Sequence, residues 1–326
     1  MEQIIDTASL FFLPIFRVFV PSDRTYWLYI LSAYLIALVV YMRVDGGWSF
    51  PALRKHVRNF FAKRIWLHRS ARLDYKILFI NSLGYFAIFP LITVSTGFAA
   101  ELTVKGLTGL SGSEGLGIPP SWGSRVALTV IWLIAWDFGF FIAHYLQHRI
   151  PVLWEFHKAH HSAEVMTPFT VFRMHPVDDL LTYSTVGIMA GLVYGCFRFV
   201  YADPVQYYMV NGLNIFWFFA LMAGYHLRHS HIWVMYPKLI SSIISSPALH
   251  LIHHSKNPKH FDKNFARIFI FWDRLAGTLY LPEHREEIEF GLGGGEEHEY
   301  QSLAKIYYRP FKLAAARLRP EVTKSK

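Results

Sequence analysis

Long apolar stretches separated by short polar segments dominate the sequence. Five of them carry at most one charged side chain over 17 to 24 residues: 26–42, 77–100, 126–143, 180–200 and 205–225. About 20 apolar residues are needed for a helix to cross the hydrocarbon core, so this pattern predicts five transmembrane helices. Only residues 201–204 separate the last two, which we expect to form a helical hairpin. Residues 10–20 are apolar but shorter, and Pro14 and Arg17 interrupt them, which favours an interfacial helix.

The charges of the connecting segments predict an orientation. Residues 43–74 contain eight Lys or Arg against two Asp, whereas residues 101–123 contain Lys105 as their one basic residue. The positive-inside rule places the first segment in the cytoplasm and the second outside. Five crossings then put residues 144–175 and everything after residue 225 on the cytoplasmic side.

Composition agrees with a membrane protein. Hydrophobic residues make up 53% of the chain and charged residues 17%, against roughly 25% in soluble proteins. The net charge of +9 lies beside apolar stretches, where basic residues face anionic lipid, so we expect no nucleic-acid partner. The single cysteine, Cys196, excludes an internal disulfide and a cysteine-built metal site.

Histidine clusters carry the candidate chemistry. The motif H-x-x-H-H occurs twice and an H-x-x-x-H pair precedes it, which gives His144, His148, His157, His160, His161, His250, His253 and His254. Residues three and four apart share one face of a helix, so each cluster can direct several imidazoles to one point. Eight imidazoles are too many for one ion and indicate two metal ions close together. Imidazole binds zinc, copper, iron and nickel, so the spacing does not select the metal.

Two further residues are candidates for orienting these ligands. Asp137 lies inside an apolar stretch, where a carboxylate is costly, and seven residues before His144 on the same helical stripe. We expect it to contact a histidine from another helix, although a structural bond between spans would also explain it. His175 precedes Pro176 at a predicted helix start, and we interpret it as a hydrogen-bond donor behind a ligand.

The histidine order resembles that of the fatty acid hydroxylase and sterol desaturase superfamily, whose members are integral-membrane di-iron enzymes. Further stretches agree with that family: LWEFHKAHHS at 153–162, RMHP at 173–176, SPALH at 246–250 and WDRLAGTLY at 272–280. The resemblance covers roughly residues 122–282. It implies an all-α fold of multi-pass transmembrane helices with a cytoplasmic helical cap that holds a histidine-rich dimetal site.

The resemblance also implies an activity. Such enzymes use two iron ions, O2 as co-substrate and two external electrons to hydroxylate or desaturate a lipid; zinc can replace iron in a purified form. Family members place further histidines between the second and third boxes, where this chain has His226, His229 and His231. We take His229 and His231 as additional metal ligands, and the spacing leaves open which of the three binds.

The chain contains no cysteine-rich ferredoxin segment or flavin motif, so a separate electron donor of the ferredoxin or cytochrome b5 type is expected. We divide the sequence into N-terminal interfacial and transmembrane segments (1–125), a catalytic domain (126–285) and a cytoplasmic basic tail (286–326). A membrane zinc hydrolase and a non-catalytic metal-binding membrane protein are the alternatives from other functional classes. A requirement for O2 and an electron donor would distinguish the oxidoreductase from both.

Overall fold

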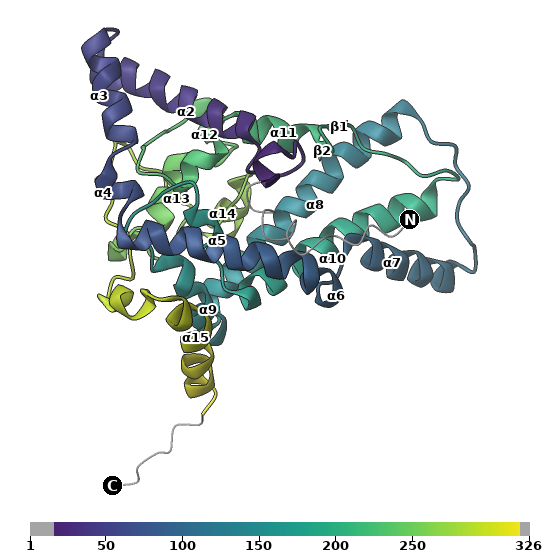
Figure 1. Ribbon diagram of the computed structural model, residues 1–326. Helices are drawn as coiled ribbons and strands as arrows, with labels where there is room; N and C mark the ends of the chain where they lie inside the picture. The colour runs from purple at the N-terminus through teal and green to yellow at the C-terminus, as the bar shows by residue number, and fades with distance from the viewer. Residues whose placement is uncertain (1–15, 320–326) are drawn as a thin grey trace.

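The computed structural model describes residues 16–319, without the side chains of residues 45–46 and 84–87, and it is mostly helical (Figure 1). The longer helices are α2 (Trp27–Tyr41), α3 (Phe50–Phe60), α5 (Arg69–Ala87), α7 (Thr96–Ser111), α8 (Trp122–Arg149), α9 (Pro151–His161), α10 (Pro176–Val200) and α15 (Leu303–Arg317). Shorter helices are α4 (Lys63–Trp66), α6 (Phe89–Ile92), α11 (Ile215–Met222), α12 (Lys238–Ser241), α13 (Pro247–His253) and α14 (Phe271–Ala276). The predicted fold class, a helical membrane protein with a histidine-rich cluster, is confirmed.

Within residues 16–319, three helical segments are long and apolar enough to cross a membrane: Trp27–Val44, Trp122–Arg149 and Pro176–Val200. They correspond to the first, third and fourth predicted spans. On α2, Leu31, Leu35 and Val39 are exposed at four-residue intervals, so one face of this helix presents apolar side chains outward. Such a face suits contact with lipid.

The predicted span at 205–225 is wrong. In its place are the strands β1 (Met209–Val210) and β2 (Leu213–Asn214), which pair antiparallel, followed by the short helix α11. Asn211 and Gly212 join the strands with φ angles of 53° and 76°, the conformation that an Asn-Gly turn of type I′ adopts. The dipeptide Asn211-Gly212 is a hairpin signal that can be recognised in the sequence.

This segment nevertheless returns along α8. The Tyr208 N–H donates to Thr129 Oγ1 at 2.9 Å, and Asn214 Nδ2 donates to the Thr129 carbonyl at 2.9 Å. Farther along both elements, Trp217 packs beside Trp136, with ring centroids 5.1 Å apart. The chain thus travels from the N-terminal end of α8 toward the end that carries His144 and His148. Histidines before and after this segment can therefore meet.

The predicted span at 77–100 is also not one helix. Its residues belong to α5, α6 and the start of α7, because Pro90 cannot continue the hydrogen bonding of α5 and Ser95 begins a new helix by accepting from the Phe98 N–H. The expected interfacial helix at 10–20 lies mostly outside the described residues; its end includes a 3₁₀ turn at Arg17–Phe19.

Helices α7, α8 and α10 pack closely because α10 and α8 carry glycines at their contacts. A Cβ at Gly191 would lie 2.5 Å from Ala99 Cβ, and one at Gly195 would lie 2.5 Å from Thr103 Cβ, both on α7. A Cβ at Gly139 of α8 would lie 2.7 Å from Val186 Cα of α10. Small residues spaced by four let membrane helices approach to backbone contact.

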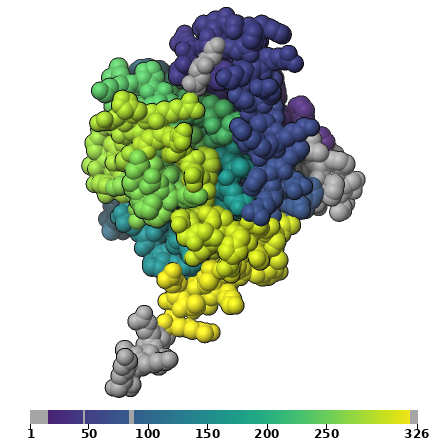
Figure 2. All heavy atoms as spheres, turned by 90° about the vertical axis from the view of Figure 1, so that its left-hand side faces the viewer, coloured from purple at the N-terminus to yellow at the C-terminus, as the bar shows by residue number. Residues whose placement is uncertain are grey.

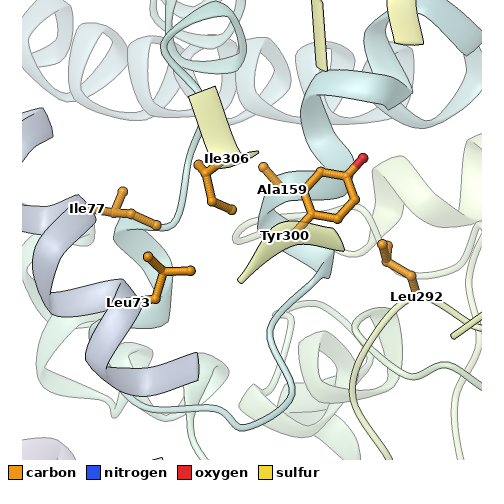
Figure 3. Packing of buried hydrophobic residues seen from close by; sticks show 6 residues of the cluster. All are labelled: Leu73, Ile77, Ala159, Leu292, Tyr300 and Ile306. Carbon is orange, nitrogen blue, oxygen red and sulfur yellow. The ribbon is translucent and has the colours of Figure 1, made fainter. Parts of the chain in front are cut away.

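The described part of the predicted basic tail, which ends at residue 319, packs onto the histidine-bearing region. Tyr300 and Ile306 are fully buried in a cluster with Leu73 and Ile77 of α5 and Ala159 of α9 (Figure 3). In Figure 2, which shows this end of the molecule, teal residues are seen between the blue N-terminal helices, green segments at the left and the yellow C-terminal segment below. The C-terminal segment therefore helps to fix α9.

Candidate metal centre

The local sequence explains how α8 and α9 present their histidines. Ser121 and Ser124 form a capping box that begins α8, and Pro151 both ends it and occupies the first turn of α9. The C-terminal end of α8 therefore directs His144 and His148 toward His157, with ring centroids 5.1 and 5.0 Å away.

Nine histidines form two adjoining groups. The first consists of His144, His148, His157, His161 and His253, and the second of His160, His229, His250 and His254. In each group the candidate ligand nitrogens lie within 4.8 Å of one another. They come from α8, α9, the 3₁₀ turn Tyr225–His229, α13 and the residue after α13. All eight histidines of the sequence clusters are thus brought together, and His229 joins them.

Several Nε2 atoms of these imidazoles face one another. His148 Nε2 is 3.1 Å from His161 Nε2, and His250 Nε2 is 3.0 Å from His229 Nε2. The buried Nε2 atoms of His157 and His253 have no hydrogen-bond partner. Because buried polar atoms normally have partners, these nitrogens indicate that a cation belongs between the rings. The residues present fit a pair of metal ions bound by nitrogen.

Burial keeps the imidazoles neutral, as metal ligands must be. It lowers the pKa of His160 to about 3 and holds the pKa values of His161, His253 and His254 well below the ordinary value. Neighbouring histidines lower these values further, because a second positive charge in the cluster is unfavourable. Near neutral pH the rings therefore offer lone pairs and do not compete as cations.

Backbone carbonyls set the tautomer of two histidines in the first group. His144 Nδ1 donates to the Phe265 carbonyl at 2.9 Å, and His253 Nδ1 donates to the Lys263 carbonyl at 2.8 Å. A carbonyl can only accept, so the proton lies on Nδ1 and Nε2 is left for a metal. Two carboxylates approach other rings: Asp178 lies 3.4 Å from His157 Nδ1, and Asp262 lies 3.5 Å from His148 Nδ1.

The second histidine group lies beside a positively charged side chain. The Arg228 guanidinium lies 3.2 Å from Nδ1 of His250 and also donates to the Ala266 carbonyl at 2.9 Å. After burial, it is the main reason that the pKa of His250 is well below the ordinary value. A guanidinium cannot accept a hydrogen bond, so Nδ1 of His250 accepts and its proton lies on Nε2. A metal ion in this group would have to replace that proton.

Three histidines that the sequence analysis considered lie elsewhere. His231 belongs to neither group; it packs beside Phe60, with ring centroids 5.9 Å apart, so its prediction as a metal ligand does not agree with the structure. His226 is buried and likewise outside both groups. His175 begins α10, since its Nδ1 accepts from the Val177 N–H at 3.1 Å, and its Nε2 donates to the Tyr307 carbonyl. It supports no ligand imidazole.

The expected contact between Asp137 and a histidine is also corrected. Its carboxylate accepts from the backbone N–H groups of Ile268 and Phe269 at 2.9 and 3.0 Å and from Trp272 Nε1 at 3.1 Å. Asp137 thus holds the segment after Phe265, whose carbonyl orients His144. Residue spacing could not show which segment packs against Asp137.

Sequence reasoning missed Asp273, which fixes the same segment from its other side. It accepts from the N–H groups of Phe265 and Ala266, both at 2.8 Å, and from Thr278 Oγ1 at 2.7 Å. The carbonyl of Phe265 is therefore positioned by a carboxylate that binds its own N–H. The position of this acid within the family-like stretch at 272–280 was the available signal.

Replacing Asp137 by asparagine should lower the free energy of unfolding by about 1–3 kcal/mol, because one amide oxygen cannot serve the three donors and leaves a buried N–H without an acceptor. Metal content per folded molecule should be unchanged, since no imidazole touches Asp137. Metal stoichiometry and melting temperature are measured on one detergent-purified sample, with the exposed Asp203→Asn as control. Metal loss at an unchanged melting temperature would contradict this role.

Three cavities adjoin the histidines or the helices around them. One of about 100 Å³ is lined by His144, His157, His160, His229 and His250 among others. A larger one of about 630 Å³ lies between α8, α11 and α12 and has an almost wholly apolar lining. A third, of about 430 Å³, is bounded by His148, His161, His253 and the glycine-rich residues 291–294. These glycines thus form part of a wall beside the cluster.

Comparison with known proteins adds the family. The family model described as fatty acid hydroxylase matches residues 129–278. Alkylglycerol monooxygenase of Caenorhabditis elegans is 26% identical over 157 residues, which cover 48% of this chain and 28% of that protein. The ornithine lipid hydroxylase OlsE of Rhizobium tropici is 26% identical over 51% of this chain and 45% of its own length. Lathosterol oxidase of Mus musculus is 26% identical over 60% of this chain and 59% of its own.

The chain spans less than two thirds of the length of these curated relatives. No solved structure matches it significantly. The matched segment contains all nine clustered histidines and both carboxylates that hold residues 265–269. This segment is therefore similar to the fatty acid hydroxylase and sterol desaturase superfamily, as the sequence predicted.

Proposed function

We propose that this protein is an O2-dependent di-iron oxidoreductase that hydroxylates or desaturates a membrane lipid. The observation that carries the proposal is the pair of histidine groups, which have no carboxylate or thiolate member. A zinc hydrolase usually binds one ion through three protein ligands, whereas this arrangement offers nine imidazoles. Relatives named as lipid monooxygenases, hydroxylases and sterol oxidases support oxidation over hydrolysis.

Different residues would bind the metal ions and admit the lipid. His144, His148, His157, His161 and His253 would hold one ion, and His160, His229, His250 and His254 the other. When bound, the iron pair would supply the redox chemistry that activates O2 for attack on an unactivated C–H bond. The carbonyls of Phe265 and Lys263 keep two of the rings in the required tautomer. The apolar cavity beside α8 would accept the alkyl chain.

Lipid mass spectrometry tests the reaction. Cells that express the protein should accumulate a lipid heavier by one oxygen or lighter by two hydrogens, and purified protein should require O2 and an external electron donor of the ferredoxin or cytochrome b5 type. A protein that retains two metal ions but gives no such product in any lipid extract, with or without donor, would contradict the proposed oxidation.

We also propose that the histidine groups face the cytoplasm, and this orientation needs a separate test. Ser111 at the end of α7 and His298 are both exposed, so each can be replaced by cysteine in a Cys196→Ser background. A membrane-impermeant thiol reagent should label position 111 in intact cells and position 298 only after the cytoplasmic face is opened. Labelling of both from one side would contradict the predicted orientation.

A further inference from the structure

The apolar cavity and the histidine-lined cavity share a charged boundary. Tyr225, Arg228 and Arg267 line both of them. On one side lie 630 Å³ of almost wholly apolar space, and on the other 100 Å³ that reach five of the clustered histidines. Exposed Phe216, Phe219 and Ile240 lie in the wall of the larger cavity, so apolar ligands can reach it from the apolar surface of the protein.

Arg267 is held by aromatic rings and not by an acid. Its guanidinium carbon lies 3.8 Å from the ring centre of Phe140, and 5.0–5.3 Å from those of Trp136, Trp217 and Tyr225. Such contacts satisfy the flat faces of a guanidinium but leave its N–H donors at the edge. Its Nε is buried and has no hydrogen-bond partner.

Asp137 and Asp273 lie close enough to attract these arginines but form no ion pair with them. Among residues 16–319, no ion pair joins an acid to Arg267 or Arg228. Asp137 and Asp273 bind the backbone N–H groups of residues 265–269 instead. Asp179 also lines the small cavity and has a partner of its own. Buried arginines that have no ion-paired carboxylate are well placed to bind the anionic group of a ligand.

We propose that the substrate is an acidic amphiphile whose carboxylate or phosphate oxygens bind Arg267 and Arg228 and whose alkyl chain fills the apolar cavity. The carbons next to the head group then lie nearest the histidines, so oxidation should occur in or beside the head group and not at the chain end. This substrate class rests on the proposed function for the identity of the reaction, whereas the binding site does not require it. A neutral sterol would bring no negative charge to the two guanidinium groups and would leave the Nε of Arg267 without an anionic acceptor.

Binding of four simple amphiphiles tests this site without any catalysis. Dodecanoate, dodecyl phosphate, dodecanol and dodecyltrimethylammonium are titrated into the full-length metal-loaded protein in a neutral maltoside detergent, with tryptophan fluorescence as readout. We expect one or both anions to bind at least tenfold more tightly than the other two, and their order identifies the head group. Equal affinities for all four would overturn the proposal.

Substitutions of Arg267 test where the anionic head group binds. Arg267→Gln should weaken binding of the preferred anion roughly tenfold to a hundredfold, the effect of losing a charge-assisted contact, and leave dodecanol unchanged. Arg267→Lys should lose less, because it keeps the charge. Arg125→Gln is the matched control, since Arg125 also stacks on a tyrosine, 4.5 Å from the Tyr208 ring centre, but lines neither cavity. Equal anion affinity in Arg267→Gln and Arg125→Gln would overturn the assignment.

A second variant tests where the alkyl chain binds, and its result does not depend on whether Arg267→Gln folds. Ala220→Phe fills the apolar cavity and should weaken binding of the preferred anion and of dodecanol alike, whereas Ala315→Phe on the exposed face of α15 should weaken neither. Unchanged binding in Ala220→Phe would overturn the placement of the chain. Selective anion binding by a protein that oxidises no lipid would contradict the proposed function and leave the binding site supported.

Discussion

Replacement of His253 or His160 by alanine should abolish lipid oxidation and lower the metal content of the protein. Each residue comes from a different group, so each variant should lose mainly one of two ions and retain about one per chain. His253 lies among three other rings, with centroids 4.4 Å from His144 and 4.8 Å from His148 and His161. Loss of a residue that merely supports a ligand already costs about 10–100-fold in affinity or activity, and loss of a ligand should cost more.

Metal analysis and product formation are measured on the same purified samples. His284→Ala serves as control, because this histidine is exposed and belongs to neither group. Two ions and full activity in both His253→Ala and His160→Ala would contradict the dimetal assignment. An intact ion count with lost activity would instead assign the two histidines to substrate handling.

The membrane helices that sequence predicted best are those without an internal turn signal. The third and fourth predicted spans, 126–143 and 180–200, are the cores of α8 and α10, whose capping residues Ser121 and His175 add a few residues at the N-terminal ends. The spans at 77–100 and 205–225 failed because hydropathy averages over Pro90 and over Asn211-Gly212. Local backbone chemistry overrides a continuous apolar pattern at both places.

The histidine groups were largely visible in the sequence, because helical spacing fixes which imidazoles of one element share a face. Their division between two groups was not, since His160 and His161 are adjacent yet join different groups. In the 3₁₀ turn Tyr225–His229 and the residues after it, spacing could not select His229 over His226 and His231, because the turn has no long helical face. Such choices depend on packing between distant segments.

Buried charges were the least predictable feature. Arg173 looked like part of a family motif, yet its side chain is 1% exposed and joins three separate parts of the chain. It lies 2.9 Å from Asp74 of α5, donates to the Ala159 carbonyl of α9 at 3.0 Å and donates to the Tyr300 carbonyl at 3.2 Å. Ala159 stands between the clustered histidines His157 and His160, so this arginine connects the histidine groups to both α5 and the C-terminal segment.

Arg173→Met should therefore lower the free energy of unfolding by about 3–5 kcal/mol, the usual cost of leaving one member of a buried ion pair alone. The fully buried Asp74 would keep Thr170 Oγ1, at 2.8 Å, as its remaining side-chain partner. Burial already raises the pKa of Asp74 and Arg173 opposes that rise, so the variant should bind a proton on Asp74 at higher pH than the parent does. Thermal unfolding in detergent, followed together with metal retention, measures the loss.

Two further variants decide whether the lost charge or the lost packing causes the lower stability of Arg173→Met. Asp74→Leu combined with Arg173→Met removes both charges, so it should be more stable than Arg173→Met alone. Arg69→Met breaks an exposed pair on the same helix, in which Arg69 Nη2 lies 2.8 Å from Glu164, and should change the melting temperature little because solvent screens that pair. If the double variant is no more stable than Arg173→Met, the hydrogen bonds to the Ala159 and Tyr300 carbonyls, and not the ion pair, hold α9 in place.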